Sequence, residues 1–150
     1  MTEKSKILLV DDDDVITETL RIVLEEEGFL VETASTGQEA ITKSFKNYYN
    51  LAIVDWRLPD ILGTKVLGSF KETIPKMEKI MLTGYPSMQN AVDSVNARAD
   101  AFFQKPIDME ILLQKIKELL KLQEQERSFS EEKMTSYIET RCMELAPKGH

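Results

Sequence analysis

The stretch ILLVDDDDVI, residues 7–16, joins four aliphatic residues to four consecutive aspartates and then returns to apolar residues. A short and nearly continuous aliphatic run is typical of a strand that is covered on both faces of a parallel sheet. Adjacent carboxylates repel one another, so four of them directly after a buried strand indicate either that a positive group lies nearby or that the cluster is a turn facing bulk water. The stretch therefore predicts a parallel strand with a charged site at its carboxyl end.

The composition of the whole chain limits the classes of protein to consider. The chain has 150 residues, of which 42% are apolar, and this fits one domain with an appendage. The net charge of −7 argues against nonspecific binding to nucleic acid or to an anionic membrane. The single cysteine, Cys142, cannot form an intrachain disulfide, and the sequence shows neither a signal-peptide pattern nor a membrane-spanning apolar run. A cytoplasmic protein without direct nucleic-acid binding is expected.

Short apolar runs alternate with amphipathic stretches along most of the chain. Apolar residues at helical spacing, Gly28 after the first amphipathic stretch and Ser87 before the fourth are typical signals of helices and their ends. Strands are predicted at residues 6–10, 29–34, 51–55, 78–82 and 100–104, and helices at 14–27, 37–47, 61–72, 87–97 and 107–122. Five alternating strand–helix units predict an open parallel α/β sheet.

In such sheets, ligands bind beyond the carboxyl ends of the strands. The residues found there are Asp11, Asp12 and Asp13 after the first strand, Asp55 at the end of the third, Thr83 after the fourth and Lys105 after the fifth. Carboxylates, a hydroxyl and an ammonium group are therefore expected to meet in one crevice.

These groups together suit metal-assisted phosphoryl transfer. Clustered carboxylates are suitable ligands for Mg²⁺. Thr83 and Lys105 are not needed to hold a cation, but a hydroxyl and a fixed positive charge can stabilise the oxygens of a phosphoryl group. A central carboxylate can act as the nucleophile and form an aspartyl phosphate. Asp55, between the acidic cluster and Thr83, is the natural candidate.

Four motifs in this order resemble the receiver domain of two-component response regulators: LLVDDD, IVDWRLPD, LTGY and FFQKP. The resemblance covers roughly residues 5–121 and suggests a stand-alone receiver. It implies the (βα)5 flavodoxin-like fold, which is a doubly wound parallel sheet with strand order 2-1-3-4-5, followed here by a C-terminal helical extension. It also implies a signalling switch rather than an enzyme, one that catalyses only its own phosphorylation and dephosphorylation.

The resemblance assigns roles to the residues that match its motifs. Asp11 and Asp12 resemble the acidic pair that binds Mg²⁺, with Asp12 as the more direct ligand. Asp55 resembles the phospho-acceptor and a further metal ligand. Thr83 resembles the switch hydroxyl, and Lys105 the lysine that accompanies the phosphoryl group.

Three other positions match the family less closely. The backbone carbonyl of Arg57 falls where the family supplies a metal ligand. Phe102 occupies the position of a switch aromatic that is often tyrosine, so no phenolic hydrogen bond is possible. Arg57 and Tyr85, two residues after Asp55 and Thr83, fall where side chains influence how easily water reaches the phosphoryl group. Phe102 could equally be an ordinary core residue, and Arg57 and Tyr85 could equally be ordinary surface side chains.

The four aspartates are expected to have different roles. Asp13 is a possible third neighbour of the metal, whereas Asp14 is expected to cap the first helix, where its charge favours the helix dipole. Asp11 and Asp13 also resemble the nucleophile and acid/base pair of haloacid dehalogenase-type phosphatases. That alternative leaves IVDW unexplained. A second alternative is a receiver-like module that binds a partner and takes no phosphate.

The resemblance implies partners of two kinds. A sensor histidine kinase or a phosphotransfer protein would supply the phosphoryl group. The output would be a downstream protein or self-association, through the face formed by the fourth helix, fifth strand and fifth helix and through the C-terminal helix.

Residues 123–150 are predicted to form an extension to a receiver domain at residues 1–122. Ser128 and Glu131 fit a capping box, which would start a separate short helix over residues 129–145. Met134, Ile138, Cys142 and Leu145 share one helical stripe, and Pro147 and Gly149 would end the helix. Such a helix would dock on the receiver, on a second copy or on a partner, and the alternative is a frayed extension of the fifth helix.

Overall fold

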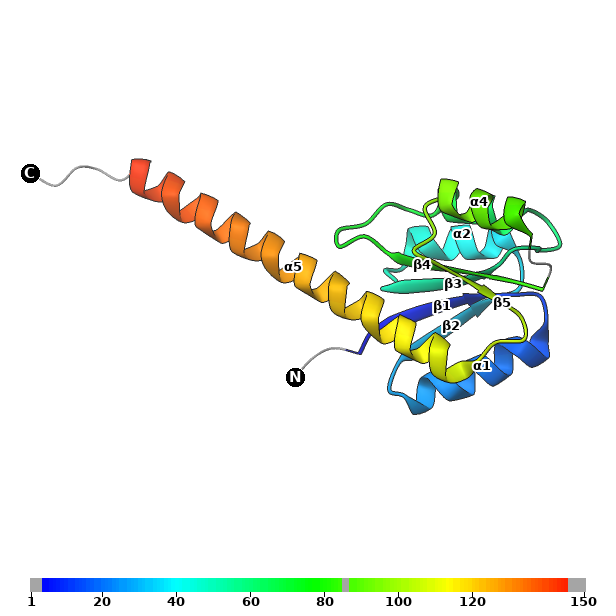
Figure 1. Ribbon diagram of the computed structural model, residues 1–150. Helices are drawn as coiled ribbons and strands as arrows, with labels where there is room; N and C mark the ends of the chain where they lie inside the picture. The colour runs from blue at the N-terminus through cyan, green and yellow to red at the C-terminus, as the bar shows by residue number, and fades with distance from the viewer. Residues whose placement is uncertain (1–3, 85–86, 146–150) are drawn as a thin grey trace, which may run out of the picture.

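The computed structural model describes residues 4–84 and 87–145, and five strands alternate with five helices in that part of the chain (Figure 1). Their bounds are β1 Lys6–Val10, α1 Asp14–Glu26, β2 Leu30–Ala34, α2 Gly37–Lys46, β3 Leu51–Asp55, α3 Gly63–Ser69, β4 Glu78–Thr83, α4 Met88–Asn96, β5 Ala101–Gln104 and α5 Met109–Leu145. The predicted alternation of strands and helices is confirmed.

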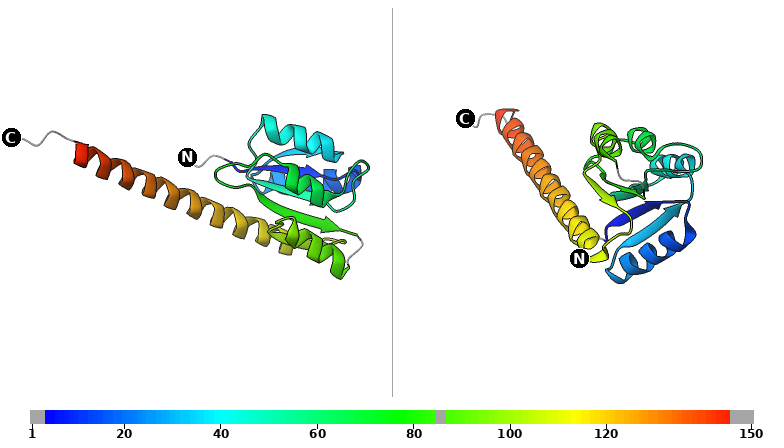
Figure 2. Two further views of the ribbon diagram at one scale, coloured as in Figure 1. Left: turned by 90° about the horizontal axis from the view of Figure 1, so that it is seen from above. Right: turned by 45° about the vertical axis from the view of Figure 1, so that its right-hand side comes forward.

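The five strands form one parallel sheet in the order β2-β1-β3-β4-β5, which confirms the predicted fold. Helices α1 and α5 cover one face of the sheet, and α2, α3 and α4 cover the other (Figures 1 and 2). Because β3 lies between β1 and β4 and is covered on both sides, all of its residues are buried. This explains why its sequence, LAIVD, shows no alternation of apolar and polar residues.

The two faces of the sheet have separate cores. Leu8, Val10 and Val54 point to the face covered by α2 and α3, where they pack with Val66 and Leu67. The intervening strand residues point the other way, to a cluster completed by these residues of α1 and α5: Leu20, Leu24, Leu112, Ile116 and Leu119. Both cores lie below the carboxyl ends of the strands and hold those ends at fixed spacing.

The start of α1 differs from the sequence prediction. Asp13, not Asp14, is the residue that caps this helix, because its side chain accepts hydrogen bonds from the backbone N–H groups of Val15 and Ile16. Asp14 is the first residue of the helix, where its negative charge lies next to the positive end of the helix dipole. By contrast, Ser87 caps α4 as predicted and accepts from the N–H of Asn90.

The largest difference concerns the C-terminal segment. Helix α5 runs without a break for 37 residues, and Ser128 lies inside it rather than at the start of a second helix (Figures 1 and 2). The predicted capping box is therefore wrong. The reason is that residues 109–145 contain neither glycine nor proline and are rich in strong helix formers, so nothing interrupts the helix. The predicted separate helix over residues 129–145 is likewise wrong, because these residues are part of α5.

The C-terminal half of α5 projects beyond the sheet (Figure 1). Gln123 is buried, and residues 124–143 after it are exposed. The side-chain amide of Gln123 donates to the backbone carbonyls of Asn50 and Lys76, each at 2.8 Å, and accepts from the side chain of Asn50 at 3.1 Å. Asn50 in turn accepts from the N–H of Lys6 at 2.8 Å. These bonds, here called the Gln123 clamp, fasten α5 to the amino ends of β1 and β3. None of the described helices is long and apolar enough to span a membrane.

Candidate functional site

The carboxyl ends of β1, β3, β4 and β5 meet at one edge of the sheet, and an open cleft of about 630 Å³ lies there. The cleft is lined by Asp11, Asp12, Asp13, Asp55, Arg57, Leu58, Pro59, Thr83, Gly84 and Lys105. The structure thus brings together all of the residues predicted at the strand ends. Among the predicted site residues that the structure describes, Phe102 is the one outside this lining.

The ammonium group of Lys105 links the two buried carboxylates of the cleft. Its Nζ lies 2.9 Å from Oδ2 of Asp11 and 3.5 Å from Oδ1 of Asp55. Lys105 follows β5, which pairs with β4, so its side chain has to reach across the strand ends toward Asp11 after β1. Burial alone would lower the pKa of Lys105, but the hydrogen bond and the charge of Asp11 raise it overall, so the amine stays charged. Lys105 is thus a positive group of the kind that the run of aspartates predicts.

The surroundings of Asp55 disfavour the negative charge of its carboxylate. Burial, followed by the nearby charge of Asp11, raises the pKa of Asp55 to about 6. The charge of Lys105 and a hydrogen bond from the backbone N–H of Arg57 oppose this rise. The carboxylate is therefore ionised at neutral pH, but the surrounding positive charge balances its negative charge only in part. A further cation or an electrophilic phosphorus atom that enters the cleft would stabilise it.

Three carboxylates are close enough to share one metal ion. Single oxygens of Asp11, Asp12 and Asp55 all lie within 4.8 Å of one another, and Asp12 is the exposed member of the three. Oδ1 of Asp11 also accepts a hydrogen bond from the N–H of Asp13 at 2.9 Å, which fixes the orientation of that carboxylate. Oxygen ligands of this kind suit Mg²⁺, which keeps several of its waters. The donor set therefore fits the predicted metal.

The other predicted residues occupy distinct places. Thr83 is fully buried and lines the cleft at the end of β4. Asp13 lines the cleft, but its carboxylate is engaged at the start of α1. Phe102 lies in β5, paired with Met81 of β4, and packs against the core cluster that includes Val66 and Leu67. Tyr85 lies outside the described residues.

Two residues between β3 and the first turn of α3 hold the surroundings of the site in place, and the sequence analysis missed both. Gly63 donates to the carbonyl of Trp56 at 2.8 Å, and a Cβ on Gly63 would overlap the backbone carbonyl oxygen of Asp55. Asp60 accepts from the N–H groups of Gly37 and Gln38 at 2.8 and 2.9 Å and so caps α2 from a distant loop. The signal for Gly63 was a glycine shortly after the LPD turn, but its close approach to Asp55 appears only in three dimensions.

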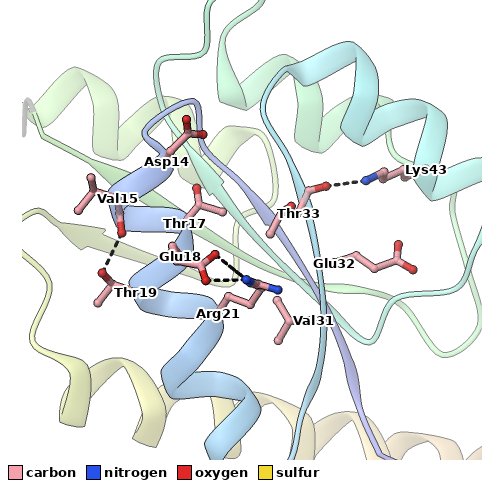
Figure 3. Close-up of a pocket in the computed structure, with 10 residues that line it drawn as sticks. All are labelled: Asp14, Val15, Thr17, Glu18, Thr19, Arg21, Val31, Glu32, Thr33 and Lys43. Carbon is pink, nitrogen blue, oxygen red and sulfur yellow. Dashed lines mark hydrogen bonds and ion pairs between the residues drawn. The ribbon is translucent and has the colours of Figure 1, made fainter.

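A second open pocket lies between α1 and α2 beside the edge strand β2 (Figure 3). Its charged groups are engaged locally: Arg21 pairs with Glu18, and Lys43 donates to the carbonyl of Thr33 at 2.6 Å. No set of three or more potential metal ligands was found here among the described residues. The strand-end cleft is therefore the better candidate for chemistry.

The cleft and the fold match known proteins closely. The family model for the response regulator receiver domain matches residues 7–117. The chain is 36% identical over 116 residues to the regulatory protein VanRB of Enterococcus faecalis, a match that covers 77% of this chain and 52% of that protein. It is 33% identical over 116 residues to the transcriptional regulatory protein TrcR of Mycobacterium tuberculosis, covering 77% and 45%. The chain thus spans about half the length of these curated relatives, and the stand-alone character stays a prediction.

Solved structures show the same likeness. A CheY-like receiver domain protein from Methanospirillum hungatei is 45% identical with a TM-score of 0.79, covering 83% of this chain and 99% of that one. A response regulator from Burkholderia pseudomallei, solved with a phosphorylated aspartic acid, a calcium ion and citrate, is 28% identical with a TM-score of 0.67, covering 73% and 65%. The match of the family model over most of the chain, together with the strand order and the strand-end cleft, identifies the chain as a member of the response regulator receiver domain family.

Proposed function

We propose that this receiver accepts a phosphoryl group on Asp55 and acts as a phosphorylation-dependent switch of a two-component system. The observation that carries the proposal is the position of Asp55. It is a buried carboxylate with a raised pKa, 3.5 Å from an ammonium group, at the centre of an open cleft. The related Burkholderia protein with a phosphorylated aspartic acid supports the same chemistry.

The transfer needs a nucleophile and charge neutralisation rather than covalent help from further residues. A carboxylate oxygen of Asp55 attacks the phosphorus of a phosphohistidine, the P–N bond breaks, and the histidine nitrogen keeps the electron pair. Lys105 is placed to neutralise charge on the phosphoryl oxygens, because it already lies beside Asp55. The hydroxyl of Thr83, which lines the cleft, would donate to one of those oxygens.

Magnesium would be held by Asp11, Asp12 and Asp55, with the backbone carbonyl of Arg57 as a further ligand. The spacing of the three carboxylates supports this assignment. The ion supplies positive charge that screens the carboxylates from the incoming phosphate. Asp13 is left out of this set because its side chain caps α1.

The switch would run from Thr83 to the face formed by α4, β5 and α5. Movement of the Thr83 hydroxyl toward the phosphoryl group would change how Phe102 packs, since Phe102 lies in the neighbouring strand β5. Arg57 and Tyr85 would set how readily water removes the phosphoryl group. A histidine kinase or a phosphotransfer protein in the cytoplasm would be the donor, and the receiver would catalyse only its own phosphorylation and dephosphorylation.

The phosphatase alternative is not favoured. It requires Asp13 as a mobile acid/base, but this side chain accepts two backbone hydrogen bonds at the start of α1. The family match also favours the receiver.

The test is phosphorylation with acetyl phosphate and Mg²⁺, read by intact-protein mass spectrometry. One phosphoryl group is expected, and Asp55→Asn should take up none. Asp14→Asn is the matched control, since Asp14 lies outside the cleft lining, and it should label like the wild type. Labelling of Asp55→Asn at the wild-type rate would show that the acceptor is another residue.

A further inference from the structure

The stripe that attaches α5 to the receiver continues past the edge of the domain. Leu112, Ile116, Leu119 and Gln123 are buried at alternating spacings of four and three residues. Helical geometry brings Arg127, Met134 and Ile138 to the same side of α5. Met134 and Ile138 are 60% and 51% exposed, and Tyr137 beside them is 63% exposed. No part of the chain within residues 4–84 and 87–145 buries these apolar side chains, so the projecting helix needs a partner surface.

The charges on this stripe limit what the partner can be. Glu131, Met134, Ile138 and Arg141 follow one another at spacings of three, four and three, which is the spacing of a helix–helix seam. The order is acid, apolar, apolar, base. Reversed end for end, the same four positions read base, apolar, apolar, acid, so the segment is complementary to an antiparallel copy of itself.

A parallel arrangement would be unfavourable. It would place Glu131 against Glu131 and Arg141 against Arg141 of the other copy, and like charges at a seam repel. In the antiparallel arrangement, each Glu131 faces an Arg141 and each Met134 faces an Ile138, twice around a two-fold axis. Such an interface is closed, because each copy uses the same surface.

The surface at the base of the projecting helix extends this seam. A groove of about 1290 Å³ is lined by Arg127, Ser130 and Glu131 of α5 and by Tyr48, Ile74 and Pro75 of the receiver. Ile74 is 95% exposed and Tyr48 is 40% exposed, so the receiver side of the groove offers exposed apolar surface beside its polar lining residues. Lys4, Lys6 and Lys76 line the groove on the receiver side, whereas Glu124 and Glu126 line it on the side of α5. An antiparallel partner helix would bring its C-terminal end here, where it would meet exposed apolar surface and where lysines on the receiver side suit the negative end of a helix.

We infer that the projecting half of α5 is a dimerisation helix whose occupant is the same segment of a second copy, paired antiparallel with Glu131 of each copy opposite Arg141 of the other. The pairing covers Met134, Ile138 and Tyr137 and extends the contact into the groove at Ile74. It does not rest on phosphorylation of Asp55, and Asp55→Asn should dimerise like the wild type.

The test is sedimentation equilibrium of the full chain over a range of concentrations. The wild type is expected to be a dimer in reversible equilibrium with monomer. Glu131→Arg and Arg141→Glu should each weaken the dimer by about tenfold, because each places two like-charged pairs at the seam. The double variant Glu131→Arg/Arg141→Glu should recover most of the lost affinity. Glu132→Arg makes the same charge change off the seam and should leave the dissociation constant nearly unchanged.

The native Cys142 provides an independent measure of orientation, since it is the only cysteine and is exposed. In the antiparallel pair, the two Cys142 residues are offset by about 12 residues, which is about 18 Å along the axis. Spin labels on Cys142 should therefore report a separation near or above that value, whereas parallel pairing would bring them together. A chain that stays monomeric, single variants without effect, a double variant without recovery, or a short label distance would each overturn the inference.

Discussion

Asp55 bears a negative charge where burial and Asp11 both oppose it. Its pKa in the folded protein is about 6, above its ordinary value of 3.8. Because the folded state favours the protonated form, ionisation of Asp55 costs stability above pH 6. That cost fades as the pH falls and is absent below about pH 3.8, where both states are protonated.

The first prediction follows from this loss of stability on ionisation of Asp55. Without metal, Asp55→Asn should raise the free energy of unfolding at pH 7.5 by about 1–2 kcal/mol, a figure that allows for screening by solvent. At pH 4 the gain should shrink to near zero. Urea denaturation at the two pH values measures it. Mg²⁺ should reduce or reverse the difference, and a less stable Asp55→Asn in metal-free buffer at pH 7.5 would contradict the assignment.

Gly63 supports the second prediction. A methyl group there would overlap the backbone of Asp55, so Gly63→Ala should cost about 1–3 kcal/mol of stability and slow phosphorylation. Gly68 lies in the same helix with open space around it, and Gly68→Ala should leave stability equal or up to about 1 kcal/mol higher. Thermal unfolding of the Gly63→Ala and Gly68→Ala variants measures the two changes in stability. Equal effects of the two substitutions would show that crowding at Asp55 is not the cause.

Among the elements, strands were easier to predict than helix ends. Residues 6–10 and 51–55 were predicted to the residue, because aliphatic runs covered on both faces leave little ambiguity. The choice between Asp13 and Asp14 as the cap failed because both residue types favour that position, and only the backbone geometry separates them. Ser128 failed for another reason: a local capping pattern does not start a helix where the preceding helix has no cause to stop.

The third prediction concerns the base of α5. Gln123→Ala removes three hydrogen bonds of the Gln123 clamp and leaves the carbonyls of Asn50 and Lys76 without that donor. We expect a loss of about 1–3 kcal/mol in unfolding free energy. Amide hydrogen exchange should also become faster around residues 120–131. Gln125→Ala, an exposed neighbour, serves as the control and should change neither measurement.

At the scale of the whole molecule, we expect the receiver and the projecting helix to have separate tasks. The cleft could be predicted because four motifs end four strands, and a parallel sheet brings strand ends together. The Gln123 clamp could not be predicted, because the partners of Gln123 lie 73 and 47 residues away in sequence and its two acceptors are backbone carbonyls, which leave no mark in the residue pattern.

A fourth prediction separates the two tasks. Truncation after Glu131 keeps the Gln123 clamp and every buried residue of the receiver. The shortened protein should unfold with the same free energy as the full chain when both are monomeric, and Asp55 should label at the same rate. Its mass in solution should be that of a monomer at every concentration. A clear loss of stability in the shortened monomer would show that the distal helix supports the receiver after all.

The unbroken course of α5 also gives the molecule a mechanical property. Between Gln123 and Leu145 the helix rises about 33 Å without a hinge, so it behaves as a stiff lever whose pivot is the base of the sheet. A tilt of about 5° at that pivot would move the far end by about 3 Å, comparable to the reach of a hydrogen bond. A small change in how the base of α5 packs on the sheet would thus become a larger displacement at the far end of the helix.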